Sequence, residues 1–179
     1  MVGEQDSENR IGRKRYVQLS LLVWVAMIGI DFFIHGGIFS ATYLQDSPFL
    51  LSDMEAFRRI PLGYLALLAT AGLLVWIMDR SSVRGWRKGL VVGLALGTVM
   101  GLSSALGLFS ISTASPQLLA ASFIAQVVGM ATAGAIIGQG LLVHSLRRLT
   151  LAVVIGFVLL LVGTIVLQNI GLAPSRIAS

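Results

Sequence analysis

Five long runs of apolar residues, separated by short charged or turn-forming segments, dominate the pattern of this chain. They cover residues 17–44, 61–78, 88–110, 117–143 and 151–168. A helix needs about 20 apolar residues to cross the hydrocarbon core of a bilayer, and every run is close to that length or longer. The pattern therefore predicts an all-α fold, a polytopic bundle of five transmembrane helices.

The segments outside these runs predict two tails around one membrane domain. Residues 1–16 are polar and mixed in charge, without apolar periodicity, so we expect a flexible cytoplasmic tail. A basic stretch before an apolar run also occurs in secretory signals. The run 17–44 is too long for that and contains Asp31 and His35, so we expect it to stay as a membrane helix. Residues 17–169 then form the membrane domain and 170–179 an external tail.

The connection over residues 45–60 has helical features of its own. Ser52 followed by Glu55 is a capping-box pattern, and Glu55 with Arg59 is an i, i+4 ion pair in the favourable order. A short helix is expected there, either lying in the outer interface or simply leading into the second span. Pro61 and Pro116 suit the first turns of the second and fourth spans, where a missing N–H costs nothing.

The distribution of basic residues predicts the orientation. Ten of the 13 Lys and Arg residues fall on one side of the predicted bundle: Arg10, Arg13, Lys14, Arg15, Arg80, Arg84, Arg87, Lys88, Arg147 and Arg148. The other side receives Arg58, Arg59 and Arg176. By the positive-inside rule the N-terminus is cytoplasmic and, after five crossings, the C-terminus is outside.

Composition narrows the class of function. The chain has 179 residues, of which 56% are hydrophobic and 12% charged, so no room is left for a soluble catalytic domain. It has no Cys, which excludes disulfides, thiolate metal sites and cysteine nucleophiles. No Ser-His-Asp set, phosphate-binding glycine loop or HExxH motif occurs. We expect a non-enzymatic protein without a cofactor, whose net charge of +5 is explained by membrane lipids rather than by nucleic acid.

A row of glycines along the third run predicts close helix packing. Gly89, Gly93, Gly97 and Gly101 recur at every fourth position, which is a glycine zipper. Small residues on one stripe let a second helix backbone approach closely, and such packing holds helices together in lipid. The fourth run has its own small residues, which make it the expected partner: Ala121, Ala125, Gly129, Ala133, Gly134 and Gly138. Self-association of two chains through the glycine row, giving a homo-oligomer, is the alternative.

Asp31 and His35 form the most informative constellation. The i, i+4 spacing puts them on one face of the first span, and Asp31 lies about 21 Å beyond Val17, within a hydrocarbon core about 30 Å thick. A charged Asp there is costly, so it should face protein or water. Helical projection places the pair on a stripe expected to be the buried side, formed by Ser20, Trp24, Met27, Asp31, His35 and Thr42. The opposite side is formed by Leu22, Val25, Gly29 and Phe33.

Several groups are candidate partners for this carboxylate. His35 itself, Arg58 and Arg59 are the first; Gln126, a long amide in mid-membrane, is another and needs either Asp31 or Ser103 as a partner. The set is read either as a proton- or ligand-responsive site or as a structural link between the first two spans. A metal site is not predicted, because two ligands lack the third and fourth donors. A haem between His35 and His144 is disfavoured, because the two lie at opposite ends of their spans.

The segment Asp31-Phe32-Phe33-Ile34-His35-Gly36, with Tyr43, Met54 and Pro61-Leu62 after it, carries a resemblance. It resembles a set of small uncharacterised bacterial multi-pass membrane proteins whose first helix has an Asp-x3-His-Gly pattern. That set has no established activity to carry over. The resemblance implies only that Asp31, His35 and Tyr43 are the positions to test.

These observations lead to one expected function and two alternatives. We expect a binding or accessory subunit of a bacterial-type cytoplasmic (inner) membrane, acting alone or in a larger complex. Its outer-leaflet polar pocket would hold a lipid, a quinone or a partner helix. A proton-coupled small transporter or channel subunit is the first alternative, although few polar residues continue a path to the cytoplasm and no inverted repeat is evident. An intramembrane enzyme acting on a lipid headgroup is the second.

Overall fold

The computed structural model describes residues 10–43 and 48–174, and its regular elements there are all helical. In chain order these are α2 (Arg13–Phe33), the π-helical turn η1 (Ile34–Ile38), α3 (Ser40–Tyr43), α4 (Asp53–Arg80), α5 (Trp86–Ile111), α6 (Pro116–Leu142) and α7 (Arg147–Asn169). Five helices are long and apolar enough to cross a membrane: Arg13–Ile38, Met54–Arg80, Trp86–Ile111, Pro116–Leu142 and Arg147–Asn169. The expected helical membrane bundle is therefore confirmed for the described residues.

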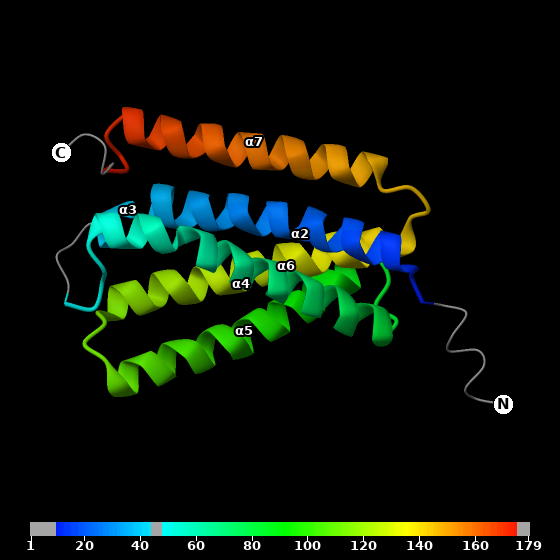
Figure 1. The fold of residues 1–179 in the computed structure, drawn as a ribbon, viewed down its shortest axis with the longest axis horizontal. Coiled ribbons are helices and arrows are strands. Elements are labelled where there is room, and N and C mark those ends of the chain that lie inside the picture. The colour runs from blue at the N-terminus through cyan, green and yellow to red at the C-terminus, as the bar shows by residue number, and fades with distance from the viewer. Residues whose placement is uncertain (1–9, 44–47, 175–179) are drawn as a thin grey trace.

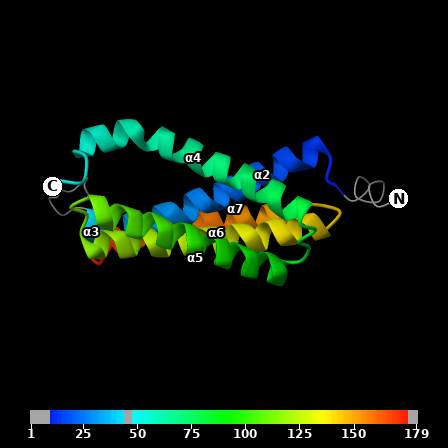
Figure 2. The same cartoon turned by 90° about the horizontal axis from the view of Figure 1, so that it is seen from below.

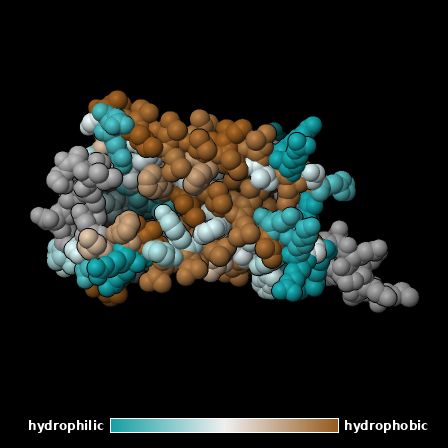
Figure 3. Space-filling model, turned by 45° about the horizontal axis from the view of Figure 1, so that its top comes forward, coloured by the Kyte–Doolittle hydropathy of each residue, from teal (hydrophilic) through white to brown (hydrophobic). Residues whose placement is uncertain are grey.

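The long helices lie side by side along one axis (Figure 1). We call the end where α2 begins the N end and the end where α7 finishes the C end. A broad hydrophobic belt lies between hydrophilic residues at these two ends (Figure 3). This arrangement is that of a multi-pass membrane protein.

Helix α2 lies at the centre of the bundle, in contact with α4, α6 and α7. Here the structure differs from the expectation of one buried side. Leu22 and Gly29, on the side opposite Asp31, are buried as well, because α7 covers them. A Cβ added to Gly29 would lie 2.8 Å from Cδ2 of Phe157. A helical projection of one span cannot show that a second neighbour covers its other face.

Helices α5 and α6 form the closest pair. All four glycines of the α5 row are buried, and an added Cβ at Gly89 or Gly93 would lie 2.1 Å or 2.2 Å from a main-chain oxygen of α6. On α6 the close contacts come from Met130, Gly134 and Gly138.

The small residues expected on α6 do not all take part in this contact. Gly134 and Gly138 do, but nothing lies within 4 Å of a Cβ built on Gly129, so the expectation for Gly129 is wrong. Gly129 and Ala125 line a cavity beside α2.

The start of α4 also differs from its prediction. The helix begins at Asp53 and continues through Pro61, so the expected short helix is the first part of α4 and Pro61 lies inside it rather than in its first turn. Ser52 Oγ donates to Glu55 Oε2 at 3.1 Å, but no ion pair joins Glu55 to Arg59 among the described residues. Pro61 is tolerated because the carbonyl of Phe57 that it leaves without a donor lies in an exposed turn.

Apolar side chains fill the bundle toward the N end. Leu19 and Val23 of α2 are fully buried against Leu74 and Met78 of α4 and Ile137 of α6. Toward the C end α4 separates from the other helices (Figure 2). Between α2, α4 and α6 the bundle is thus closed toward the N end and more open where α2 finishes.

Candidate functional site

Asp31 and His35 are in direct contact at the C-end half of α2. The Nδ1 atom of His35 lies 3.2 Å from Oδ1 of Asp31 and 2.9 Å from the main-chain oxygen of Asp31. Two oxygen acceptors at one nitrogen require that Nδ1 carries the proton. The other ring nitrogen, Nε2, has no hydrogen-bond partner within the described part of the chain, so it is available to a ligand.

A π-helical turn carries His35. Residues Ile34–Ile38 widen the helix directly after α2, and such turns are frequent at functional sites. The freed main-chain oxygen of Gly36 accepts a hydrogen bond of 3.0 Å from Nε2 of Gln168 on α7. Thr164 of α7 is fully buried beside Gly36 and Gly37. Sequence reasoning missed these two α7 residues; their signal was that they are polar residues within the last apolar run.

Tyr43 adds an aromatic neighbour from α3. Its ring meets the His35 ring edge-on, with centroids 4.8 Å apart and an interplanar angle of 63°. Its hydroxyl lies 3.2 Å from Oγ of Ser122 on α6. Burial raises the pKa of Tyr43 above its usual value, so the phenol is neutral at physiological pH.

Two cavities open beside the Asp31–His35 pair. One, of about 200 Å³, lies between α2, α4 and α6 and includes Ser122 and Gln126 in its wall. The other, of about 380 Å³, lies between α2 and the first half of α4 and includes Tyr64. Asp31, His35 and Leu67 line both cavities. The side chains of His35 and Asp31 keep 28% and 43% of their area exposed, so a molecule in either cavity reaches them.

The structure does not bring Arg58 and Arg59 to this site. Both are exposed in the first turns of α4, and neither pairs with Asp31. The first part of α4 stands away from α2 (Figure 2), which separates the arginines from the carboxylate. Of the candidate partners named for Asp31, the structure therefore joins His35 to it and leaves Arg58 and Arg59 apart.

Gln126 lies at the site without the partner expected for it. It lines the smaller cavity with Asp31, yet its amide makes no hydrogen bond to Asp31 or Ser103 among the bonds of the described residues. The methylene groups of its side chain pack against the α5 row, since Cβ and Cγ lie 3.4 Å from a Cβ built on Gly101. Its amide is thus a free donor and acceptor beside the pair.

The arrangement suits binding better than metal chemistry or conduction. Within residues 10–43 and 48–174, no three His, Asp or Glu side chains come together as a metal site would need. Toward the N end, the Asp31–His35 pair is followed on α2 by the apolar cluster around Leu19 and Val23, beside which Ser20 is a buried hydroxyl without a hydrogen-bond partner among the described residues. Comparisons of the chain with protein-family models, with curated proteins and with solved structures returned no match.

Proposed function

We propose that the chain is a non-enzymatic binding or accessory subunit of a bacterial-type cytoplasmic membrane. Its site binds the polar head of an amphiphilic molecule from the bilayer beside Asp31 and His35. The observation that carries this proposal is a carboxylate–imidazole pair within a membrane-spanning helix that opens onto two cavities. Ionisable groups within membrane spans are rare and usually functional.

The residues around the pair favour a ligand with a small hydrogen-bonding head. Asp31 offers acceptor oxygens, His35 offers Nε2, and the Gln126 amide both donates and accepts. Met27, Ile30 and Leu67 supply apolar wall around them. A mostly apolar cavity with a few convergent polar groups is typical of ligand sites. A lipid headgroup or a quinone ring has this chemistry; a polar residue of a partner helix is the other occupant of the same kind.

Access from the bilayer is supported by the position of α4. None of the described residues from Met54 to Ala66 is buried, and the larger cavity lies between this segment and α2. A ligand held in the acyl-chain region therefore reaches Asp31 by passing between α2 and α4, without crossing an aqueous phase.

The distribution of charge supports an orientation with the N end cytoplasmic. The first turns of α2, α5 and α7 and the last turn of α4 lie together at the N end, and α4 begins at the C end (Figure 1). The helix ends at the N end carry most of the basic residues, whereas Arg58 and Arg59 belong to the first turns of α4. Positive residues concentrate on the cytoplasmic side of membrane proteins. The ligand site then belongs to the outer leaflet.

A proton-coupled transporter subunit is the second candidate, favoured by the titratable pair between two cavities. Transport requires a polar route to the other side, and the apolar cluster of the N-end half lies across it. Reconstituted protein tests this candidate. A flux in proteoliposomes that follows pH and is lost in Asp31→Asn would establish transport and overturn the binding role.

Ligand binding is tested by identifying what co-purifies with the chain in mild detergent. Native mass spectrometry with lipid and quinone extraction compares the wild type with Asp31→Asn and His35→Gln. We expect a bound amphiphile in the wild type and a loss of about tenfold or more in both variants, since losing one buried charged hydrogen bond costs at least about 1.4 kcal/mol.

The chain offers matched controls for both substitutions. Glu55→Gln changes an exposed carboxylate near the C end, and His144→Gln changes an exposed histidine at the N end. Both controls should keep the amphiphile. Equal occupancy in all five proteins, with normal insertion, would show that Asp31 and His35 hold no ligand.

A further inference from the structure

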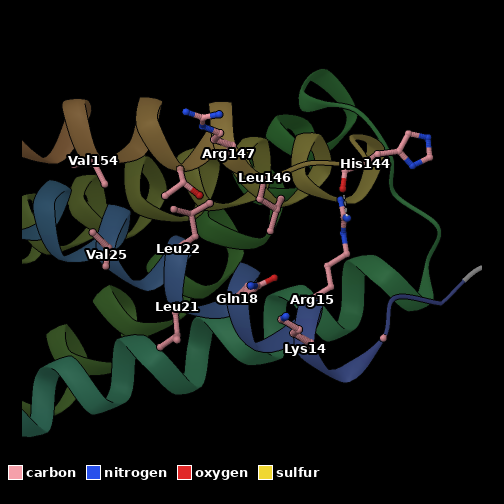
Figure 4. Close-up of a pocket in the computed structure, with 12 residues that line it drawn as sticks. Lys14, Arg15, Gln18, Leu21, Leu22, Val25, His144, Leu146, Arg147 and Val154 are labelled. Atoms are coloured by element: carbon pink, nitrogen blue, oxygen red, sulfur yellow. Dashed lines mark hydrogen bonds between the residues drawn. The ribbon is translucent and has the colours of Figure 1, made fainter.

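A second cavity system lies at the other end of the molecule, away from Asp31. It is a groove of about 760 Å³ between the first turns of α2 and α7, bounded at the N end by the segment that joins α6 to α7. Lys14, Gln18 and Leu21 lie on one wall, with Arg147 across from them (Figure 4). The proposed function assigns no role to this groove.

The groove has two chemically different parts. Its rim at the N end carries Lys14 and Arg147, both exposed. Farther along, its walls become apolar, with Leu21 and Val154 exposed on the two sides and Val25 between them. No Asp or Glu is among the described residues that line it.

Arg15 also lines the groove, but its charge is already engaged. Its guanidinium donates to the main-chain oxygens of Gly140, Val143 and His144, with distances of 2.6 Å to Gly140 and 2.9 Å to His144. It thereby satisfies carbonyls at the C-terminal end of α6, where a cation is favoured. Lys14 and Arg147 pair with no carboxylate among the described residues, so these two cations remain for an external anion.

The groove extends over the same range of depth in the bilayer as a phospholipid, from the headgroup level into the acyl-chain region. Lys14 and Arg147 lie in the first turns of two helices long and apolar enough to cross a membrane, and basic residues at the ends of such spans lie near the lipid headgroups. Val25 and Val154 lie about two to three turns farther along their helices, within the acyl-chain region. One molecule that fits both parts must carry a negative head and an apolar tail, and a soluble anion would leave the apolar walls unused.

We infer that this groove binds one anionic phospholipid, with the phosphate between Lys14 and Arg147 and an acyl chain along Leu21, Val25 and Val154. Charge complementarity decides the occupant: Lys14 on α2 and Arg147 on α7, neither of them in an ion pair among the described residues, line an opening without a carboxylate. A bound lipid fills the space between the first turns of α2 and α7. It is independent of any ligand at Asp31.

Retention of defined lipids by the full chain tests this inference. The purified protein is exchanged into nanodiscs of equal parts phosphatidylglycerol and phosphatidylcholine, and retained lipid is counted by native mass spectrometry after ejection. We expect one phosphatidylglycerol retained in preference to phosphatidylcholine. The double variant Lys14→Ala/Arg147→Ala should lower this preference by about thirtyfold, since two cations near the surface together contribute about 2 kcal/mol.

A matched variant distinguishes lipid binding in the groove from a general attraction of anionic lipid to the basic end of the molecule. Lys88→Ala/Arg148→Ala removes the same charge at the same end from exposed residues that do not line the groove, and it should retain the lipid. Glycerol phosphate, which has the head without the tail, should not displace it. Equal retention of both lipids by the wild type, equal losses in the two double variants, or displacement by glycerol phosphate would each overturn the inference.

Discussion

At the scale of single residues, spacing along a helix predicted which groups share a face but not which groups meet across helices. The i, i+4 relation of Asp31 and His35 is intrinsic to an α-helix, and the structure joins the two at 3.2 Å. Arg58 and Arg59 were plausible partners only on the assumption that α4 approaches α2 at that level. Because such pairing depends on how two helices diverge in space, the sequence of either helix does not contain it.

The glycine row of α5 predicts that adding a single methyl group to it destabilises the protein. In Gly93→Ala the new Cβ would lie 2.2 Å from the main-chain oxygen of Met130, so α5 and α6 must separate. We expect a loss of about 3 kcal/mol or more in the free energy of unfolding, at or above the upper end of typical overpacking costs. Unfolding in detergent micelles followed by circular dichroism measures it.

Gly107→Ala, on the same helix, is the control. Nothing lies within 4 Å of a Cβ at Gly107, so this change should leave stability unaltered or raise it by up to about 1 kcal/mol. Similar unfolding curves for the two variants would mean that α5 does not pack through this row.

At the scale of elements, the apolar runs predicted where the helices lie. The proline at the start of the second run, however, predicted the wrong first residue for that helix. The third, fourth and fifth spans begin and end within a few residues of their predicted limits. The second begins at Asp53 instead of Pro61, because proline is favoured in a first turn and is also tolerated farther inside an exposed helix. Ser52 was the better signal, since it occupies the N-cap position of α4, although its side chain makes no capping hydrogen bond.

Helix α4 depends on few attachments, which predicts how it responds to one substitution. Trp24 Nε1 donates to the main-chain oxygen of Tyr64 at 2.8 Å, and among the described residues this is the bond between α2 and α4 nearest the C end. Trp24→Phe removes it at a cost of about 1 kcal/mol. We expect the first half of α4 to move over a wider range.

Spin labels measure that range directly. The chain has no Cys, so labels attach only to the introduced pair Ile38→Cys and Phe57→Cys, both exposed positions. Their distance distribution should broaden in Trp24→Phe and stay as in the wild type in Trp86→Phe, whose exposed ring lies on α5. An unchanged distribution in Trp24→Phe would show that other contacts hold α4 in place.

At the scale of the whole molecule, the arrangement of the helices in the bundle could be established only from the structure. Five apolar spans specify a membrane protein, but they do not specify that α2 lies between α7 and the α4–α6 side. That position follows from Gly29, where an added Cβ would lie 2.8 Å from Phe157 of α7, as well as from the contacts of α2 with α4 and α6. It also explains why the Asp31–His35 pair lies among neighbouring helices: the helix that carries it is the central one.

The two ends of the bundle give the last prediction, because the positive-inside rule makes the N end cytoplasmic. Ser81 lies in the exposed turn after α4 at the N end, and Thr113 is exposed in the connection before α6 at the C end. Each becomes the only thiol in the chain when replaced by Cys. A membrane-impermeant maleimide added to intact spheroplasts should label Thr113→Cys at once and Ser81→Cys only after the membrane is opened. Detergent-treated samples of both variants control for reactivity. The reverse pattern would place the Asp31–His35 site in the cytoplasmic leaflet and Lys14 and Arg147 in the outer one, since both assignments depend on the same axis.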